Sequence, residues 1–132
     1  MRAKLSVLRA CRRLLRPGSK IAFYTIFTPP GVSEADRRRV LALGDPPELA
    51  SATREPDLLR SAGFADIEEI DETAEYLRTA RGWYEGRERY AGELRKLEGA
   101  QAFADGQENR RKRIGFIEAG LQGRALFVAV RS

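Results

Sequence analysis

The residue types that most often carry catalysis are scarce in this sequence of 132 residues. It contains no histidine and a single cysteine, Cys11. Nucleophilic sites of the Ser-His and Cys-His kinds need an imidazole, so the composition excludes them. Zinc and iron sites draw mainly on several cysteines and histidines, so we expect no metal site. Cys11 lies on an apolar stripe, which predicts a buried thiol.

Charged residues form two further groups that could do chemistry. Glu68 and Glu69 are adjacent, but neighbouring residues of a strand point to opposite faces, so these carboxylates cannot converge on one substrate atom. The four basic residues at 110–113 could bind nucleic acid, and the net charge of +5 would assist. No aromatic residues are interleaved with them. A solvated helix face is the favoured interpretation, and nucleic acid is not an expected partner.

Residues 7–27 form the stretch around which the elements of the chain are organised. An apolar stripe at helical spacing predicts a helix, with these members: Val7, Leu8, Cys11, Leu14 and Leu15. Pro17 ends that helix, and Gly18 permits the reversal that follows. Residues 20–27 are aromatic and β-branched, which is typical of a buried strand. A helix that turns into a buried strand is half of an α/β unit.

Two helices and a strand are expected next. Ser33 is a good N-cap for a helix over residues 34–43, and a break is predicted at residues 44–47 from Gly and Pro. Residues 54–62 predict the second helix. Residues 65–71 predict a short strand with imperfect alternation, and its carboxylates suggest an exposed edge.

The last third of the chain predicts two helices and a final strand. Residues 73–98 keep a helical period that glycines interrupt, so a break is expected there, and residues 108–120 predict another helix. Residues 124–130 alternate and are β-branched, as a strand requires. No apolar run approaches the roughly 20 residues that span a bilayer. We therefore expect no membrane association and a cytoplasmic location.

Three motifs in this order resemble class I S-adenosylmethionine-dependent methyltransferases, in particular type 11-like members that act on small molecules. LLRPGSKIAFYTIF at residues 14–27 is similar to the turn and fifth strand of that family, with Ser19 in place of the usual second glycine. LLRSAGF at residues 58–64 resembles the turn before the sixth strand. GLQGRALFVAV at residues 120–130 resembles the last strand.

The resemblance implies an α/β class and a partial Rossmann-like methyltransferase fold. It would contain the three C-terminal strands, with the last one antiparallel between the other two, flanking helices and a helical insertion. Residues 1–132 would form a single partial domain. Its helix-strand-helix-strand part would cover residues 1–72, its helical cap insertion residues 73–122 and its final strand residues 123–132.

In this family the N-terminal half holds the cofactor, S-adenosylmethionine, through a glycine-rich turn and an acidic residue. The sequence has 12 glycines but no G-x-G, so no cofactor-binding residue can be carried over. The resemblance thus implies a methyltransferase of small molecules that lacks its cofactor-binding N-terminal half here. Activity of this chain alone is not expected.

The family mechanism is direct methyl transfer, in which the protein mainly positions and desolvates the reactants. The resemblance places acceptor-lining residues at the ends of strands and in the insertion, and no catalytic residue is assigned. The candidates for the substrate cleft are Tyr24, Phe27, Thr28, Asp71, Thr73, Tyr76, Trp83 and Tyr84. Core packing is the alternative role for Trp83 and Tyr84. A loop or cap hydroxyl is the alternative for Thr28 and Thr73.

A second interpretation is a non-catalytic remnant or interaction module. Without the neighbour that a full sheet supplies, the strand at residues 20–27 would expose an edge that pairs readily. A homodimer, another chain or a separately encoded N-terminal half would cover it. A basic nucleic-acid-binding domain is the least favoured interpretation.

Overall fold

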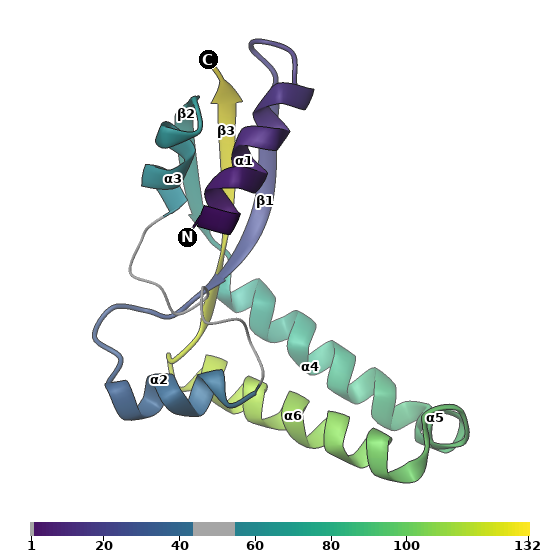
Figure 1. The fold of residues 1–132 in the computed structure, drawn as a ribbon. Coiled ribbons are helices and arrows are strands. Elements are labelled where there is room, and N and C mark those ends of the chain that lie inside the picture. The colour runs from purple at the N-terminus through teal and green to yellow at the C-terminus, as the bar shows by residue number, and fades with distance from the viewer. Residues whose placement is uncertain (1, 44–54) are drawn as a thin grey trace.

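The computed structural model describes residues 2–43 and 55–132. The elements, in chain order, are α1 (Arg2–Leu14), β1 (Lys20–Phe27), α2 (Glu34–Leu41), α3 (Glu55–Ser61), β2 (Phe64–Asp71), α4 (Thr73–Arg89), α5 (Ala91–Glu98), α6 (Ala100–Glu118) and β3 (Gly123–Arg131). This order confirms the predicted α/β class. Figure 1 shows two parts: the strands with α1 and α3, and a helical arm of α4, α5 and α6 that projects away from them.

The three strands form one sheet in the order β1-β3-β2, and β3 is antiparallel to both neighbours. The pairing of β1 runs from Lys20 opposite Val130 to Phe27 opposite Gly123. The last strand of the chain therefore lies between the two earlier ones, as predicted. Because β1 and β2 both run against β3, their C-terminal ends meet at the same end of the sheet, beside the start of β3.

A bulge in β2 explains the imperfect alternation of its sequence. Ala65 and Glu68 lie opposite Val130 and Val128, so β2 has one residue more than β3 over this step. Asp66, inside the bulge, has a φ of 49°, a region that aspartate tolerates better than most residues. The extra residue lets Phe64 and Ile67, three positions apart, both pack into the core.

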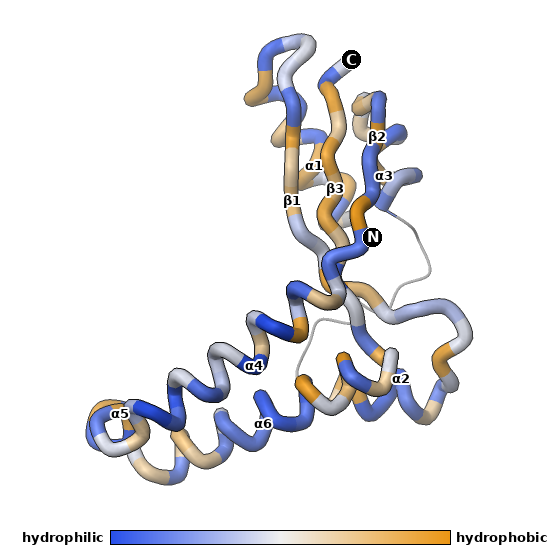
Figure 2. The backbone as a smooth tube through the Cα atoms, turned by 180° about the vertical axis from the view of Figure 1, so that it is seen from behind, coloured by the Kyte–Doolittle hydropathy of each residue, from blue (hydrophilic) through white to orange (hydrophobic). Residues whose placement is uncertain are grey.

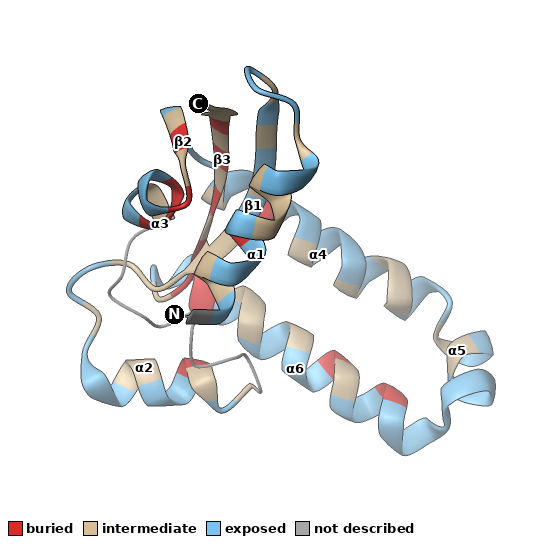
Figure 3. Ribbon diagram, turned by 45° about the horizontal axis from the view of Figure 1, so that its top comes forward, coloured by how far each residue is buried: buried red, intermediate tan, exposed pale blue. Residues whose placement is uncertain are grey.

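α1 and α3 cover one face of the sheet, and the main core lies between these helices and the sheet. Its buried members are Leu8, Leu58, Leu59, Ala62, Phe64, Ala125, Phe127 and Ala129. Phe23 of β1 stacks on Phe127 of β3, with ring centroids 5.7 Å apart. Figure 3 shows buried segments gathered in β2, β3 and α3, whereas most of the arm is exposed or half-buried.

The opposite face of the sheet is bare in the part of the chain that the structure describes (Figure 2). Leu126 of β3 lies there with Tyr24 of β1 and Ile70 of β2 on either side, and those two flanking side chains are 57% and 43% exposed. β1 also has a free edge, since β3 is its one partner among the described strands. The predicted bounds of this strand are confirmed, but its predicted burial is wrong: no residue of β1 is fully buried, because β1 lies at an edge.

α1 is longer than predicted, and it packs through a different set of residues. Leu8 is buried, and Leu5 and Leu15 pack against the core. Val7 and Leu14, which the predicted stripe included, are 61% and 87% exposed. The helix lies over the edge of a narrow sheet, so one flank of its apolar stripe has nothing to pack against.

Cys11 lies on that flank and is half-buried, so the prediction of a buried thiol is wrong. With Val7, Ile21 and Phe23 it lines an apolar groove of about 580 Å³ between α1 and β1. Lys4 and Glu55 border the groove and form an ion pair of 2.9 Å between Nζ and Oε1.

α2 begins as predicted, with the Ser33 hydroxyl oxygen accepting a hydrogen bond from the Asp36 amide at 3.2 Å. Its Arg39 guanidinium stacks on the ring of Phe116 from α6, 5.5 Å from the centroid, which joins α2 to the arm. The predicted break at residues 44–47 lies outside the described residues, and so does residue 54 of the next predicted helix.

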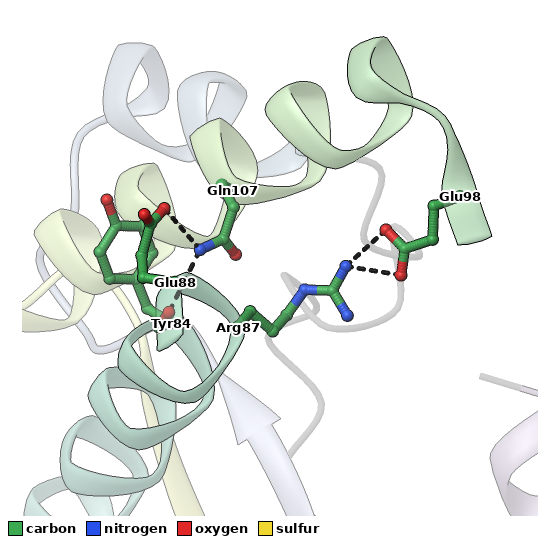
Figure 4. A network of polar contacts seen from close by, with 5 residues as sticks. All are labelled: Tyr84, Arg87, Glu88, Glu98 and Gln107. Atoms are coloured by element: carbon green, nitrogen blue, oxygen red, sulfur yellow. Dashed lines mark hydrogen bonds and ion pairs between the residues drawn. The ribbon is translucent and has the colours of Figure 1, made fainter. Parts of the chain in front are cut away.

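The arm is a helical hairpin with a short helix at its tip. The break predicted within residues 73–98 falls at Tyr90, between α4 and α5. α6 starts at Ala100, earlier than the predicted residue 108. Two polar contacts join the helices at the tip (Figure 4): Arg87 Nη2 lies 2.6 Å from both carboxylate oxygens of Glu98, and Gln107 Nε2 donates to the Tyr84 carbonyl oxygen at 3.1 Å.

Candidate functional site

Most of the candidate cleft residues meet where β1 and β2 end and β3 begins. The residues at this corner are Tyr24, Phe27, Asp71, Thr73 and Tyr76. Phe27 pairs with Gly123, and Asp71 pairs with Ala125, which fixes both strand ends beside β3. α4 starts directly after β2, so its first turn carries Thr73 and Tyr76 to the same corner. The topology therefore brings residues from three elements to one end of the sheet.

The side chains of Phe27 and Thr73 both pack against Gly123 at this corner. A Cβ atom there would lie 2.7 Å from Phe27 Cζ and 2.7 Å from Thr73 Oγ1. Real Cβ atoms do not approach other heavy atoms so closely, so glycine permits the ring and the hydroxyl to close onto β3. The Thr73 hydroxyl oxygen also accepts a hydrogen bond from the Arg124 amide at 3.3 Å.

Asp71 precedes Glu72, the N-cap of α4, and its carboxylate binds Thr73, the first residue of that helix. Its Oδ1 accepts hydrogen bonds from the Thr73 hydroxyl at 2.6 Å and from the Thr73 amide at 2.9 Å. The hydroxyl contact first, and the amide contact second, lower the pKa of Asp71 below its ordinary value of 3.8, and slight burial opposes them. A carboxylate with a lowered pKa is a weak general base, so this contact favours a positioning role over proton abstraction.

Arg124 occupies the centre of the corner, and sequence reasoning missed it. Its Cζ lies 4.4 Å from the ring centroid of Tyr24 and 5.4 Å from that of Tyr76. The guanidinium is thus held between two aromatic rings, one on the bare face of the sheet and one on α4. The sequence carries one signal for this residue, a cation at the start of the last strand. It carries no signal for the two aromatic neighbours.

A second polar group lies behind Tyr76. The buried Gln122 Oε1 accepts a hydrogen bond from Arg113 Nη1 at 3.0 Å and lies 3.4 Å from the Tyr76 hydroxyl. Arg113 Nη1 also donates to that hydroxyl at 3.4 Å. Tyr76 is itself buried, so a guanidinium at its ring face and another at its hydroxyl fix its orientation. Arg113 and Gln122 were not among the predicted residues.

The remaining candidates lie away from this corner. Trp83 and Tyr84 are further along α4; seven residues beyond Tyr76 correspond to about 10 Å of helix. Trp83 is 64% exposed, so core packing, the alternative for this residue, is wrong. Tyr84 is half-buried, and its hydroxyl accepts a hydrogen bond from Arg111 Nη2 at 3.2 Å. Thr28 follows β1 and is half-buried.

Trp83 lines a groove of about 630 Å³ between α4 and α5, together with Tyr90, Leu94 and Leu97.

Within residues 2–43 and 55–132, no three cysteine and acidic side chains come together as a metal site would require. None of the helices in these ranges is both long and apolar enough to cross a bilayer.

Comparison with known proteins identifies the fold. No protein-family model and no curated protein sequence matches the chain. Among solved structures, it is similar to a phosphoethanolamine N-methyltransferase 2 from Haemonchus contortus, determined with phosphomonomethylethanolamine and S-adenosylhomocysteine. The TM-score is 0.80 and the identity 18%, and the match covers 96% of this chain and 30% of that one.

Two further structures give the same result. A Galdieria sulphuraria protein assigned as a sarcosine dimethylglycine methyltransferase matches with a TM-score of 0.85 and 15% identity, over 98% of this chain and 47% of its own. The cyclopropane synthase MmaA2 from Mycobacterium tuberculosis matches with a TM-score of 0.76 and 14% identity, over 96% and 49%. The chain therefore has part of a methyltransferase fold, and it spans half or less of the length of these three neighbours.

Proposed function

We propose that this chain forms the acceptor-side part of an S-adenosylmethionine-dependent methyltransferase that acts on a small molecule. The cofactor-binding part would lie outside these 132 residues. The observation that carries the proposal is the sheet order β1-β3-β2 with β3 antiparallel, in a fold that matches methyltransferases over nearly the whole chain. The Haemonchus contortus neighbour was determined with S-adenosylhomocysteine, and a second structure of that protein was determined with S-adenosylmethionine.

Fold similarity alone does not establish activity, so the proposal also rests on the corner at the start of β3. Bound S-adenosylmethionine would supply an electrophilic methyl group on a sulfonium. Tyr24, Tyr76 and Arg124 lie in contact at the end of the strands, and such a cluster of side chains can orient an acceptor. Asp71 holds Thr73, the first residue of α4, through two hydrogen bonds.

The bare sheet face and the free edge of β1 support a role for a further segment or chain. Half-exposed apolar side chains on this face and an unpaired strand edge are costly to leave in water. A cofactor-binding part that continues the sheet at β1 would cover both. The same observation favours a second candidate function: a non-catalytic module that covers these surfaces by pairing with itself or with another chain.

The test starts with the coding sequence that precedes residue 1 in its source. Any in-frame segment that encodes a strand and a G-x-G turn is expressed joined to this chain, and S-adenosylmethionine binding is measured by calorimetry. We expect binding to the joined protein, loss of binding when the first glycine of that turn is replaced by valine, and no heat with the 132-residue chain alone.

Two results would contradict the proposal. A joined protein that folds but binds no S-adenosylmethionine would remove the methyltransferase assignment. Binding by the 132-residue chain alone would show that the cofactor site does not lie elsewhere. If no such segment exists, and sedimentation shows a stable homodimer without cofactor binding, the non-catalytic module replaces the proposal.

A further inference from the structure

Arg124 differs from the other arginines of the described chain in how its side chain is satisfied. Its Nε is buried and has no hydrogen-bond acceptor. Arg37, Arg87 and Arg131 also have a buried Nε without an acceptor, but each has another partner. Arg87 Nη2 pairs with Glu98, Arg131 Nη1 donates to the Leu15 carbonyl oxygen, and Arg37 makes a further interaction. The guanidinium of Arg124 makes no hydrogen bond or ion pair to any oxygen of the described residues.

The guanidinium lies over two tyrosine rings, with its Cζ 4.4 Å from the Tyr24 centroid and 5.4 Å from the Tyr76 centroid. Such a cation–π contact stabilises the charge but supplies no oxygen acceptor for the N–H donors of the guanidinium. A buried donor without an acceptor costs free energy, so an acceptor supplied from outside would be favourable. A planar fork of N–H donors matches the oxygens of a carboxylate or a phosphate.

The charges around Arg124 favour an anion and disfavour a cation. Arg113 lies at the hydroxyl of Tyr76, so a second guanidinium borders the same ring. The Asp71 carboxylate at this corner is engaged by two donors of Thr73. A methylammonium group at this position would meet the like charge of Arg124, which already lies over the Tyr24 and Tyr76 rings.

We propose that Arg124 is a binding residue for an oxyanion, a carboxylate or a phosphate, carried by the methyl acceptor. The statement that the methyl acceptor carries the anion rests on the proposed function. The anion site itself depends only on the corner at the start of β3. The anionic group would accept hydrogen bonds from the N–H donors of the Arg124 guanidinium, which the contacts with Tyr24 and Tyr76 hold in place.

The site can be tested on the 132-residue chain without cofactor. Inorganic phosphate and acetate are titrated separately into ¹⁵N-labelled protein, and the Arg124 Nε–Hε resonance is followed by NMR. We expect a saturable shift with at least one of the two anions, and the stronger response identifies phosphate or carboxylate as the preferred group. Tetramethylammonium chloride, added as the cationic probe, should give no saturable shift.

Variants of single arginines distinguish anion binding at this site from nonspecific attraction of anions to a basic protein. Arg124→Gln should weaken binding by about ten- to a hundredfold, because the charged donors are lost. Arg124→Lys keeps the charge without the fork and should weaken it less. Arg81→Gln removes an exposed arginine of α4 that pairs with Glu118 and should leave the affinity unchanged. For the glutamine and lysine variants of Arg124, the anion-dependent shift is followed at the backbone amides next to position 124.

Equal affinity in Arg124→Gln and the unaltered chain would overturn the inference, as would the absence of a saturable shift with both anions. If Arg124→Gln does not fold, as judged by its thermal transition, Arg124→Lys carries the test. The two proposals fail differently. Loss of anion binding with intact S-adenosylmethionine binding in the joined protein removes only the inference, whereas the opposite result removes only the proposed function.

Discussion

At Gly123, a single added methyl group would meet two side chains of the candidate site. The Cβ of Gly123→Ala would lie 2.7 Å from both Phe27 Cζ and Thr73 Oγ1, and Phe27 packs against the core. We expect the free energy of unfolding to fall by about 1–3 kcal/mol, the usual cost of overpacking. Urea denaturation followed by circular dichroism measures it.

Gly115→Ala provides the matched control for this substitution. Gly115 lies within α6, and a Cβ there would meet nothing within 4 Å. Alanine is favoured over glycine in a helix by roughly 0.8–1 kcal/mol, so this variant should be more stable than the unaltered chain. Equal stability of Gly123→Ala and Gly115→Ala would show that the corner adapts without strain.

Individual residues also show which parts of the candidate site could be predicted from the sequence. Tyr24 and Asp71 could be selected as residues toward strand ends, and Tyr76 as an aromatic residue of the helical insertion. Arg124 and Gln122 could not, because an arginine at the start of a strand reads as an exposed charge. Its two aromatic neighbours come from positions 100 and 48 residues earlier in the chain, and one sequence carries no signal for such contacts.

Among the elements, the helical arm depends on polar contacts at its tip. Gln107 is buried on α6, and its Nε2 donates to the Tyr84 carbonyl at 3.1 Å and to Glu88 Oε1 at 3.0 Å (Figure 4). Gln107→Ala should destabilise the hairpin by about 1–2 kcal/mol, because acceptors lose their donor and a small cavity forms. We expect faster hydrogen exchange at amides of α4 and α6 near the tip and unchanged exchange in β3.

Gln101→Ala is the control for this variant, since Gln101 lies on the same helix but is exposed, and its Nε2 donates to the exposed Asp105 Oδ1 at 2.9 Å. Its exchange rates should match those of the unaltered chain. Uniformly faster exchange in the arm and the sheet of the Gln107 variant would mean that the two parts unfold together, which would contradict a local role for the tip.

Element bounds were predictable where backbone chemistry fixes them. Pro17 and Gly18 separated α1 from β1, and β1 was predicted with its observed bounds. The start of α6 was not predictable, because residues 100–107 include Gly106 and have no clear apolar period. The buried face of α1 was predicted wrongly for another reason. Val7 and Leu8 both fit a helical stripe, and the position of the helix over a narrow sheet decides that Leu8 is the buried one.

For the molecule as a whole, the strand order followed from the resemblance and could not have come from periodicity. Alternation identifies β3 as a strand but does not say that it inserts between β1 and β2. The bare face and free edge follow from the same order: with α1 and α3 on one side of three strands, no other helix of residues 2–43 and 55–132 covers the opposite face (Figure 2). These surfaces are the physical basis for the proposed assembly.

The groove between α1 and β1 has a practical consequence, because it contains the one thiol in the sequence. Cys11 is half-buried and lines this groove beside the free edge of β1. If a cofactor-binding part continues the sheet at β1, alkylation of Cys11 by iodoacetamide should be several-fold slower in the joined protein than in the 132-residue chain. Equal rates, measured by mass spectrometry, would argue against docking at this edge. Cys11 thus serves as a built-in chemical reporter of assembly, readable before any acceptor is known.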